Sequence, residues 1–160
     1  MAYDWRSKAI VALSVAGIAI AFYHAYGEIT FTLNSCSLSS AFSCKAVFAS
    51  GYTTFPPAGS IPGLGNGIEF WVYGVVWFPL CLVMGLWTLR KYGGPSASVM
   101  VPFLMIGNIF TLYPWDIEIR LLGGVYCPVC ISMYLVNYIM TFVALTYRPQ
   151  GPEADAPPSP

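Results

Sequence analysis

Four long apolar runs divide the chain and limit what it can fold into. They lie at about residues 10–31, 68–89, 99–115 and 129–147. A helix needs about 20 predominantly apolar residues to cross the hydrocarbon core of a bilayer. Only 9% of the residues are charged, against about a quarter in an average soluble domain, so water cannot be the solvent for most of the surface. The runs predict an all-α, polytopic membrane protein, built as a bundle of four transmembrane helices.

Positively charged residues are divided unequally between the two sides of this bundle. An even number of spans places both termini on one side. Lys45 and Arg120 fall on the opposite side, whereas five fall with the termini: Arg6, Lys8, Arg90, Lys91 and Arg148. Because cytoplasmic segments carry the excess of lysine and arginine, we expect cytoplasmic termini. Residues 1–148 are the predicted membrane domain, and the Pro-rich residues 149–160 are a cytoplasmic tail too polar to join a core.

The two segments predicted on the outer side hold four of the five cysteines. Cys36 and Cys44 lie in the long interruption at residues 32–67, and Cys127 and Cys130 lie where the last run begins. An outward location gives them a compartment that permits disulfides. The fifth, Cys81, lies inside the second run with no cysteine nearby in sequence, and we interpret it as a small buried hydrophobic residue.

The Cys127-Pro128-Val129-Cys130 stretch has the spacing of a redox dithiol. Proline suits the first position of a helix, where its missing N–H costs nothing. Cys130 then lies in the first turn, where free N–H groups and the helix dipole favour a nucleophilic thiolate. Tyr134 and Asn137 follow on the same helical face. They are expected to form the floor of a site for a quinone head group, or alternatively to join helices through hydrogen bonds.

The interruption at residues 32–67 is predicted to be an outward lid that contains a short helix. Cys36 and Cys44 enclose a small polar loop, so a disulfide between them would be exposed and open to exchange. Residues 45–50 predict a short amphipathic helix. Residues 53–67 carry no charge and are rich in proline and glycine. A loop of this length is usually functional, and this one is expected to lie on the bilayer or over a pocket.

The single histidine, His24, lies at the outer end of the first run, beside Tyr23, Tyr26 and Glu28. Aromatic and polar residues at a membrane boundary keep an apolar body in the headgroups and a polar tip in water. We therefore predict that His24 is an interfacial polar residue. A proton carrier near the outer face is the alternative.

Other classes of function fit less well. The net charge of zero gives no basic footprint for nucleic acid. A CxxC pair is also half of a zinc site, but the first pair lacks zinc-knuckle spacing and an outward site is oxidising, so no metal is expected. A non-enzymatic membrane scaffold with two structural disulfides is the stronger alternative. Against this alternative, a disulfide within a CxxC stretch closes a small ring and stabilises a fold poorly.

Two local stretches resemble the vitamin K epoxide reductase family. Cys44-Lys-Ala-Val-Phe-Ala-Ser50-Gly-Tyr52 is similar to the family's segment after its loop cysteines, and Cys130-Ile-Ser-Met-Tyr134 is similar to its CxxC-plus-tyrosine signature. The order and spacing match from about Ala16 to Tyr147. The bacterial disulfide-bond oxidase B family has the same chemistry, but its CxxC precedes its loop pair, so the order here disfavours it.

The resemblance implies roles for the four paired cysteines. Cys130 would react with the quinone, and Cys127 would exchange with Cys44. Cys36 would meet an external thioredoxin-like protein, which is expected to be a separate protein here. The implied activity is a membrane disulfide oxidase that uses menaquinone or ubiquinone in a cell membrane. The alternative is a vitamin K quinone or epoxide reductase in the endoplasmic reticulum membrane, with a lumenal active site.

The resemblance also implies which residues bind the quinone. Tyr134 would hydrogen-bond one quinone oxygen, Phe48 would line the pocket from the lid, and Ser50 would support the lid. The family commonly has an asparagine near the start of the second span, which bonds the other oxygen. That place falls on Phe70 here, and the nearest polar candidates are Asn66 and Glu69.

Overall fold

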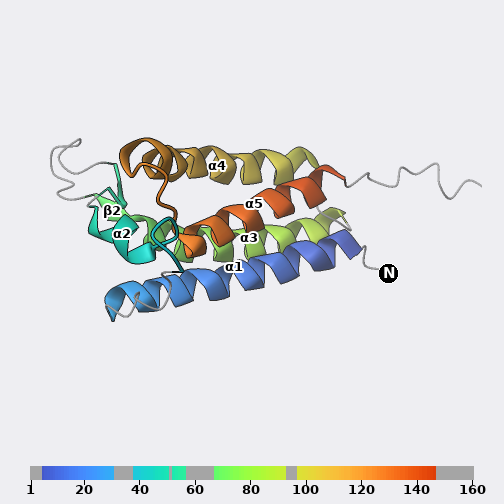
Figure 1. Ribbon diagram of the computed structural model, residues 1–160. Coiled ribbons are helices and arrows are strands. Elements are labelled where there is room, and N and C mark those ends of the chain that lie inside the picture. The colour runs from blue at the N-terminus through green and yellow to red at the C-terminus, as the bar shows by residue number, and fades with distance from the viewer. Residues whose placement is uncertain (1–4, 31–37, 51, 57–66, 93–96, 147–160) are drawn as a thin grey trace, which may run out of the picture.

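Four long helices lie lengthwise beside one another in the computed structural model (Figure 1). The structure describes residues 5–30, 38–50, 52–56, 67–92 and 97–146. The long helices are α1 (Trp5–Ile29), α3 (Phe70–Tyr92), α4 (Ala97–Asp116) and α5 (Pro128–Leu145). The short helix α2 (Cys44–Ala49) lies at the end of the bundle opposite to the beginning of α1 and the end of α5.

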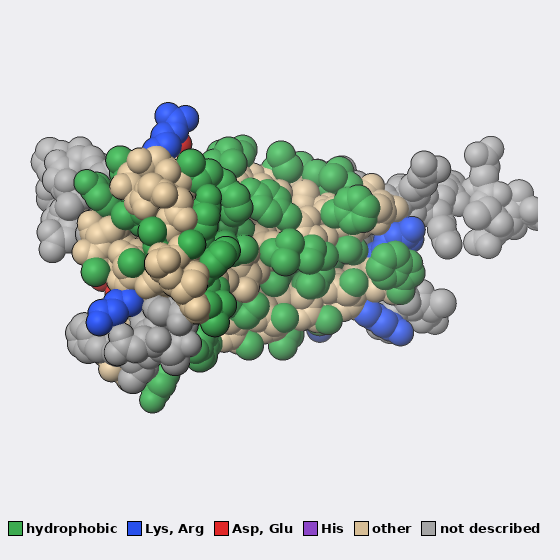
Figure 2. Space-filling view, in the orientation of Figure 1, with side chains coloured by type: hydrophobic (Ala, Val, Ile, Leu, Met, Phe, Trp, Pro, Cys, Tyr) green, Lys and Arg blue, Asp and Glu red, His purple; other side chains and the backbone are tan. Residues whose placement is uncertain are grey.

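Three of these helices are long and apolar enough to cross a membrane, counting only the described residues: α1, α3 and α5. Apolar side chains cover the middle of the bundle, and lysine and arginine side chains lie toward its two ends (Figure 2). Large apolar residues such as Val83, Ile109 and Phe142 are more than 60% exposed. Lipid is the solvent that such a surface suits, so the protein is a membrane protein. The crossing by α4 stays a prediction.

The second long helix begins two residues later than the sequence indicated. Strand β1 (Thr54–Phe55) pairs antiparallel with β2 (Ile68–Glu69), and α3 begins only at Phe70. Gly67 precedes β2 with φ of +76°, a left-handed conformation that glycine adopts without steric cost. The expected all-α architecture therefore includes a small hairpin, which ties a segment of the outer loop to the residues directly before α3.

Close packing of α1 on α3 depends on a glycine. A Cβ atom at Gly17 would lie 2.2 Å from Cδ1 of Phe78, so only glycine lets the aromatic ring lie against the α1 backbone. Phe78 belongs to a buried core with Ile10, Met140 and Cys81. Cys81 is a fully buried free thiol, as the sequence predicted.

A polar network joins α3, α4 and α5 inside this core. Asn137 accepts from Trp77 Nε1 at 2.9 Å and donates to the Leu104 carbonyl at 3.3 Å and to the Asn108 side chain. Asn108 in turn donates to Thr141 at 2.9 Å. Polar groups away from water must find partners within the protein. The amide of Asn137 is thus engaged between helices, which favours the second of its two predicted roles.

A polar seam joins the outer loop to the segment before α5. Tyr126 N donates to the Ala41 carbonyl at 2.9 Å, and Ser43 N donates to the Tyr126 carbonyl at 3.0 Å. The π-helical turn Ile117–Leu121 and two glycines with positive φ, Gly123 and Gly124, bring the chain back to this seam. The sequence placed this segment only as the interval between the third and fourth apolar runs. The seam matters because Cys44 and Cys127 each follow one of its residues directly.

Candidate active site

Cys44 is held at the first position of α2. The Ser43 side chain accepts from Ala46 N at 3.2 Å and so caps the helix, which satisfies one of the donors that a helix start leaves free. Cys44 is completely buried and disulfide-bonded. At the other end, the Ser50 hydroxyl donates to the Val47 carbonyl and accepts from Tyr52 N. These bonds fix the end of α2 and agree with the predicted support of the lid, whose function stays a prediction.

Cys127 is the N-cap residue of α5. Its sulfur accepts a hydrogen bond from Cys130 N at 3.4 Å, and Pro128 occupies the start of the helix, as the motif predicts. Both cysteines are free thiols, and both are buried. The helix start therefore holds two reduced sulfurs side by side, with the Cys127 sulfur on the side of the outer loop.

The sulfur of Cys127 lies 3.2 Å from the sulfur of Cys44. This contact joins residues 83 positions apart, and it places a free thiol directly against a disulfide-bonded cysteine. Cys36, the other predicted member of the outer pair, lies outside the described residues. Attack of a thiolate on a disulfide sulfur is the elementary step of thiol–disulfide exchange, so the geometry suits exchange between the two predicted pairs.

Cys127 is the more acidic of the inner sulfurs. A hydrogen bond from the Cys130 thiol outweighs the effect of burial and lowers the pKa of Cys127 to about 5, with His24 adding to the shift. The sequence led us to expect the thiolate on Cys130. The contacts favour a thiolate on Cys127 instead, because the N-cap sulfur accepts from both the backbone and the side chain of Cys130.

Glu118 is a buried carboxyl that the sequence did not single out. It is 1% exposed, and its Oε1 accepts from Cys127 N at 3.1 Å. Its Oε2 is buried without a hydrogen-bond partner among the described residues. Burial raises the pKa of Glu118 to about 7. The available signal was a carboxyl between Ile117 and Ile119, but nothing in that pattern indicates which turn carries it inward.

Glutamine at position 118 is expected to remove a pH-dependent loss of stability. Because the folded-state pKa of Glu118 is raised from 4.5 to about 7, its contribution to stability is present below pH 4.5 and is lost as the pH rises through about 7. Wild type and Glu118→Gln should therefore have similar unfolding midpoints at about pH 4, and the variant should be the more stable at about pH 8. Thermal unfolding in one detergent measures the difference; an equal difference at both pH values would contradict the burial argument.

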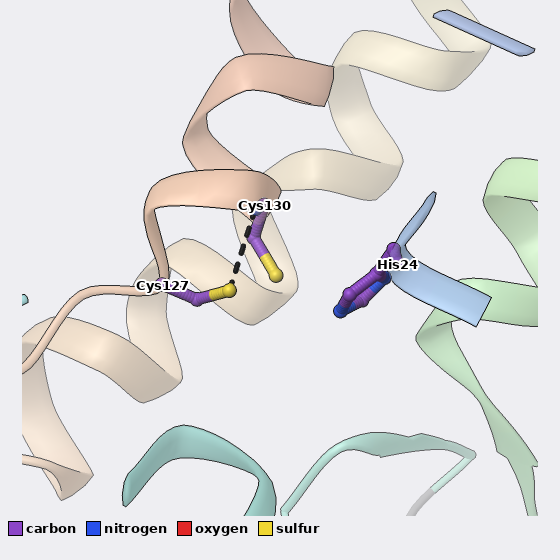
Figure 3. Close-up of side chains that lie close together, drawn as sticks. All are labelled: His24, Cys127 and Cys130. Carbon is purple, nitrogen blue, oxygen red and sulfur yellow. Dashed lines mark hydrogen bonds between the residues drawn. The ribbon is translucent and has the colours of Figure 1, made fainter. Parts of the chain in front are cut away.

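His24 lies inside the bundle beside the two inner sulfurs. Its side chain is completely buried, and its ring centroid lies 4.9 Å from that of Phe48. A ring nitrogen of His24 and the sulfurs of Cys127 and Cys130 all lie within 4.8 Å of one another (Figure 3). The predicted interfacial position was wrong, because this face of α1 packs against the bundle, whereas Tyr23 and Tyr26 on the other faces are more than half exposed.

A cavity of about 280 Å³ lies beside Cys130. It is lined mostly by apolar side chains, as pockets for small apolar ligands are, and its wall includes Cys130, Tyr134, Asn137, Phe70, Trp77 and Phe110. Three predicted quinone-site residues are thus brought together here: Tyr134, Asn137 and Phe70. Phe48 lies in a smaller neighbouring cavity that shares Phe70, Cys130 and Tyr134 with the first. Asn66 lies outside the described residues.

The cavity fits a quinone ring by size and chemistry, with one exception. Cys130 and Tyr134 supply a thiol and a phenol on the same wall. Phe70, at the family's usual asparagine place, supplies no hydrogen-bond donor. Two other polar residues of the wall have bonds of their own, since Trp77 donates to Asn137 and Tyr73 donates to the Phe55 carbonyl at 2.7 Å. The bond from Asn66 or Glu69 to the second quinone oxygen stays a prediction.

Comparison with known proteins identifies the family. No curated protein matches the chain. The model of the Vitamin K epoxide reductase family, however, matches residues 8–145 and so covers most of the sequence. This match includes the two cysteine pairs and the four long helices except the first three residues of α1, and it confirms the resemblance carried by the two local stretches. The chain belongs to the vitamin K epoxide reductase family, whose members are membrane oxidoreductases acting on thiols, disulfides and quinones.

Proposed function

We propose that the protein is a membrane disulfide oxidase. In this proposal, electrons pass from a thioredoxin-like protein on the outer side to Cys36 and Cys44, then to Cys127 and Cys130, and finally to a quinone. One observation carries the proposal: the free sulfur of Cys127 lies 3.2 Å from the disulfide-bonded sulfur of Cys44. Without this contact, the two pairs would be separate features of one fold.

We propose that Cys36 is the disulfide partner of Cys44. The bonds, electrons and protons of the exchange between the two pairs then balance. The partner protein's dithiol reduces the Cys36–Cys44 disulfide and becomes a disulfide itself. The Cys44 thiolate then attacks the Cys127 sulfur of a Cys127–Cys130 disulfide and displaces Cys130. Cys36 next attacks Cys44 in the mixed disulfide and releases Cys127. The outer pair is again oxidised, and the inner pair now carries two electrons and two protons.

The bonding of the sulfurs supports this order of exchange. Cys44 is disulfide-bonded, whereas Cys127 and Cys130 are free thiols. Cys130 and Tyr134 both line the cavity of about 280 Å³. We infer that Cys130 faces the quinone there and that Tyr134 donates to a quinone oxygen. The dithiol would supply the two electrons and two protons that convert a quinone, such as menaquinone or ubiquinone, into its hydroquinone.

The proposed orientation places the cysteines outward in a cell membrane, with cytoplasmic termini. It is supported by the positions of the charges at the two ends of the bundle, since Lys45 and Arg120 lie at the end that carries α2, and Arg6 and Arg90 lie toward the other. A vitamin K epoxide reductase in the endoplasmic reticulum would use the same site. Replacement of the quinone by the epoxide in an assay of the purified protein distinguishes the two activities.

A cross-linking experiment tests the proposed relay. In the Cys36→Ala/Cys130→Ala variant, Cys44 and Cys127 lose their usual partners, and mild oxidation should join them almost completely because their sulfurs are already in contact. Non-reducing peptide mapping, with Cys81 blocked after denaturation, measures the product. The Cys36→Ala/Cys127→Ala variant is the matched control and should form much less of a Cys44–Cys130 bridge. Equal yields in the two variants would refute selective exchange through Cys127.

A further inference from the structure

The proposed relay gives no role to the buried histidine beside the inner sulfurs. His24 is completely buried, and neither ring nitrogen has a hydrogen-bond partner among the described residues. A buried polar group without a partner is costly and therefore needs an explanation, and a redox or catalytic role is one of the few that native proteins offer. Figure 3 shows the ring pointing from α1 toward the two sulfurs at the start of α5. The distances, within 4.8 Å to both sulfurs, leave room for small movements that make a direct contact.

Within the part of the chain that the structure describes, no lysine or arginine takes this place beside the inner sulfurs. Lys45 is exposed, and Arg120 is exposed and paired with Asp116 at 2.6 Å. The titratable groups that interact with His24 among the described residues are Glu28 on its own helix and the sulfurs of Cys127 and Cys130. Glu118 on the π-helical turn and Tyr134 on α5 interact in turn with Cys130. Helix α2 contributes the uncharged ring of Phe48. A thiolate in such surroundings needs a compensating positive charge.

We propose that His24 is the proton carrier of the inner thiol pair, which accepts the proton of Cys127 when the pair is reduced and returns it when the pair is oxidised. This inference rests on the proposed function. Imidazole suits the role because it gains and loses a proton near neutral pH. His24 differs from Glu118 in its contacts. A ring nitrogen of His24 lies near both sulfurs, whereas Oε1 of Glu118 accepts a hydrogen bond from the backbone N–H of Cys127.

The proton and electron balance is complete with this carrier. In the reduced state, Cys127 is a thiolate, His24 is an imidazolium and Cys130 is a thiol. Oxidation forms the Cys127–Cys130 disulfide and transfers two electrons to the quinone. One proton comes from Cys130 and the other from His24, so that hydroquinone and neutral imidazole result. The next exchange with Cys44 delivers two electrons to the inner pair, and two protons from the outer thiols restore His24 and Cys130.

The sequence itself provides a direct test, because His24 is the single histidine in the chain. Wild-type protein labelled with ¹⁵N-histidine gives one imidazole to observe by NMR. We expect an imidazolium at about pH 7 when the thiols are reduced, and a neutral imidazole when both pairs are oxidised. The same protonation state in both redox forms between about pH 5 and pH 8 would overturn the proposal, even if the protein reduces quinone.

Variants provide a second test with a different readout. In His24→Gln, the pH at which Cys127 reaches half its maximal alkylation rate should rise by about one unit, which is a tenfold change in thiolate formation. Single-turnover quinone reduction by the reduced variant should slow, whereas Cys44–Cys127 cross-linking in the Cys36→Ala/Cys130→Ala background should persist.

Tyr23→Phe, one residue away on the exposed face, is the control and should match wild type. An unchanged alkylation profile in His24→Gln would contradict the role of His24, whereas failure of wild type to reduce quinone would refute the proposed function instead.

Discussion

Replacement of Cys127 by alanine is expected to lower electron transfer from a reduced thioredoxin-like protein to quinone by at least about 1,000-fold, as the loss of an essential nucleophile does. Cys127 is the inner cysteine whose sulfur touches Cys44, and it is also the partner that Cys130 needs to form a disulfide. One substitution therefore removes the sulfur through which electrons enter the inner pair. It also prevents the inner disulfide whose formation would pass those electrons to the quinone. Stopped-flow absorbance of the quinone, with the reduced partner in excess, measures the loss.

The matched control for this substitution is Cys81→Ala. Cys81 is a free and fully buried cysteine like Cys127, but it belongs to the apolar core rather than to the cysteine cluster. Transfer should remain near the wild-type rate in this variant. Transfer at more than about a tenth of the wild-type rate in Cys127→Ala, with unchanged thermal unfolding, would show that the electrons take another path.

Replacement of Asn137 by leucine is expected to lower the free energy of unfolding by about 2 kcal/mol. Leucine has a similar size, but it would leave Trp77 Nε1 without its acceptor and the Asn108 carbonyl oxygen without its donor. Unsatisfied groups in a water-free interior are the main cost of such a change. Reversible unfolding in mixed detergent micelles measures the difference from wild type.

Tyr138→Phe is the control for the Asn137 substitution. It removes a hydroxyl from α5 one residue further on, where Tyr138 and Thr111 share a hydrogen bond of 3.0 Å at an exposed position. This loss should cost less than about 1 kcal/mol. A similar small cost for Asn137→Leu would mean that the network between α3, α4 and α5 contributes little, and that the asparagine is present for the cavity that it lines.

The sequence predicted the positions of the long helices, because length and apolar composition determine which segments can enter a bilayer. The start of α5 was also readable, since Pro128 and the following apolar run mark a helix beginning at the CxxC stretch. The exchange of Cys127 with Cys44 came from the family resemblance. The 3.2 Å contact now gives that expectation a geometry.

The inward direction of single residues was not readable from the same patterns. In a soluble helix, polar residues mark the face that points to water, but a helix in lipid is apolar on both its inner and outer faces. His24 therefore looked like a boundary residue, and its burial follows only from the packing of α1. Glu118 was missed for a related reason. The π-helical turn Ile117–Leu121 sets the direction of its side chain, and no residue type in that turn indicates that the backbone is π-helical there.

The seam between the outer loop and the segment before α5 has a kinetic consequence. Backbone hydrogen bonds between Ser43, Ala41 and Tyr126 hold the sulfurs of Cys44 and Cys127 in contact. Reactants held in this way behave as if each were present at an effective concentration far above any that free thiols reach, on the order of 10⁵ M in well-oriented cases. The exchange between the pairs should then be too fast to limit turnover, so the overall velocity would depend on the arrival of the thiol protein at one end and the departure of hydroquinone into the bilayer at the other.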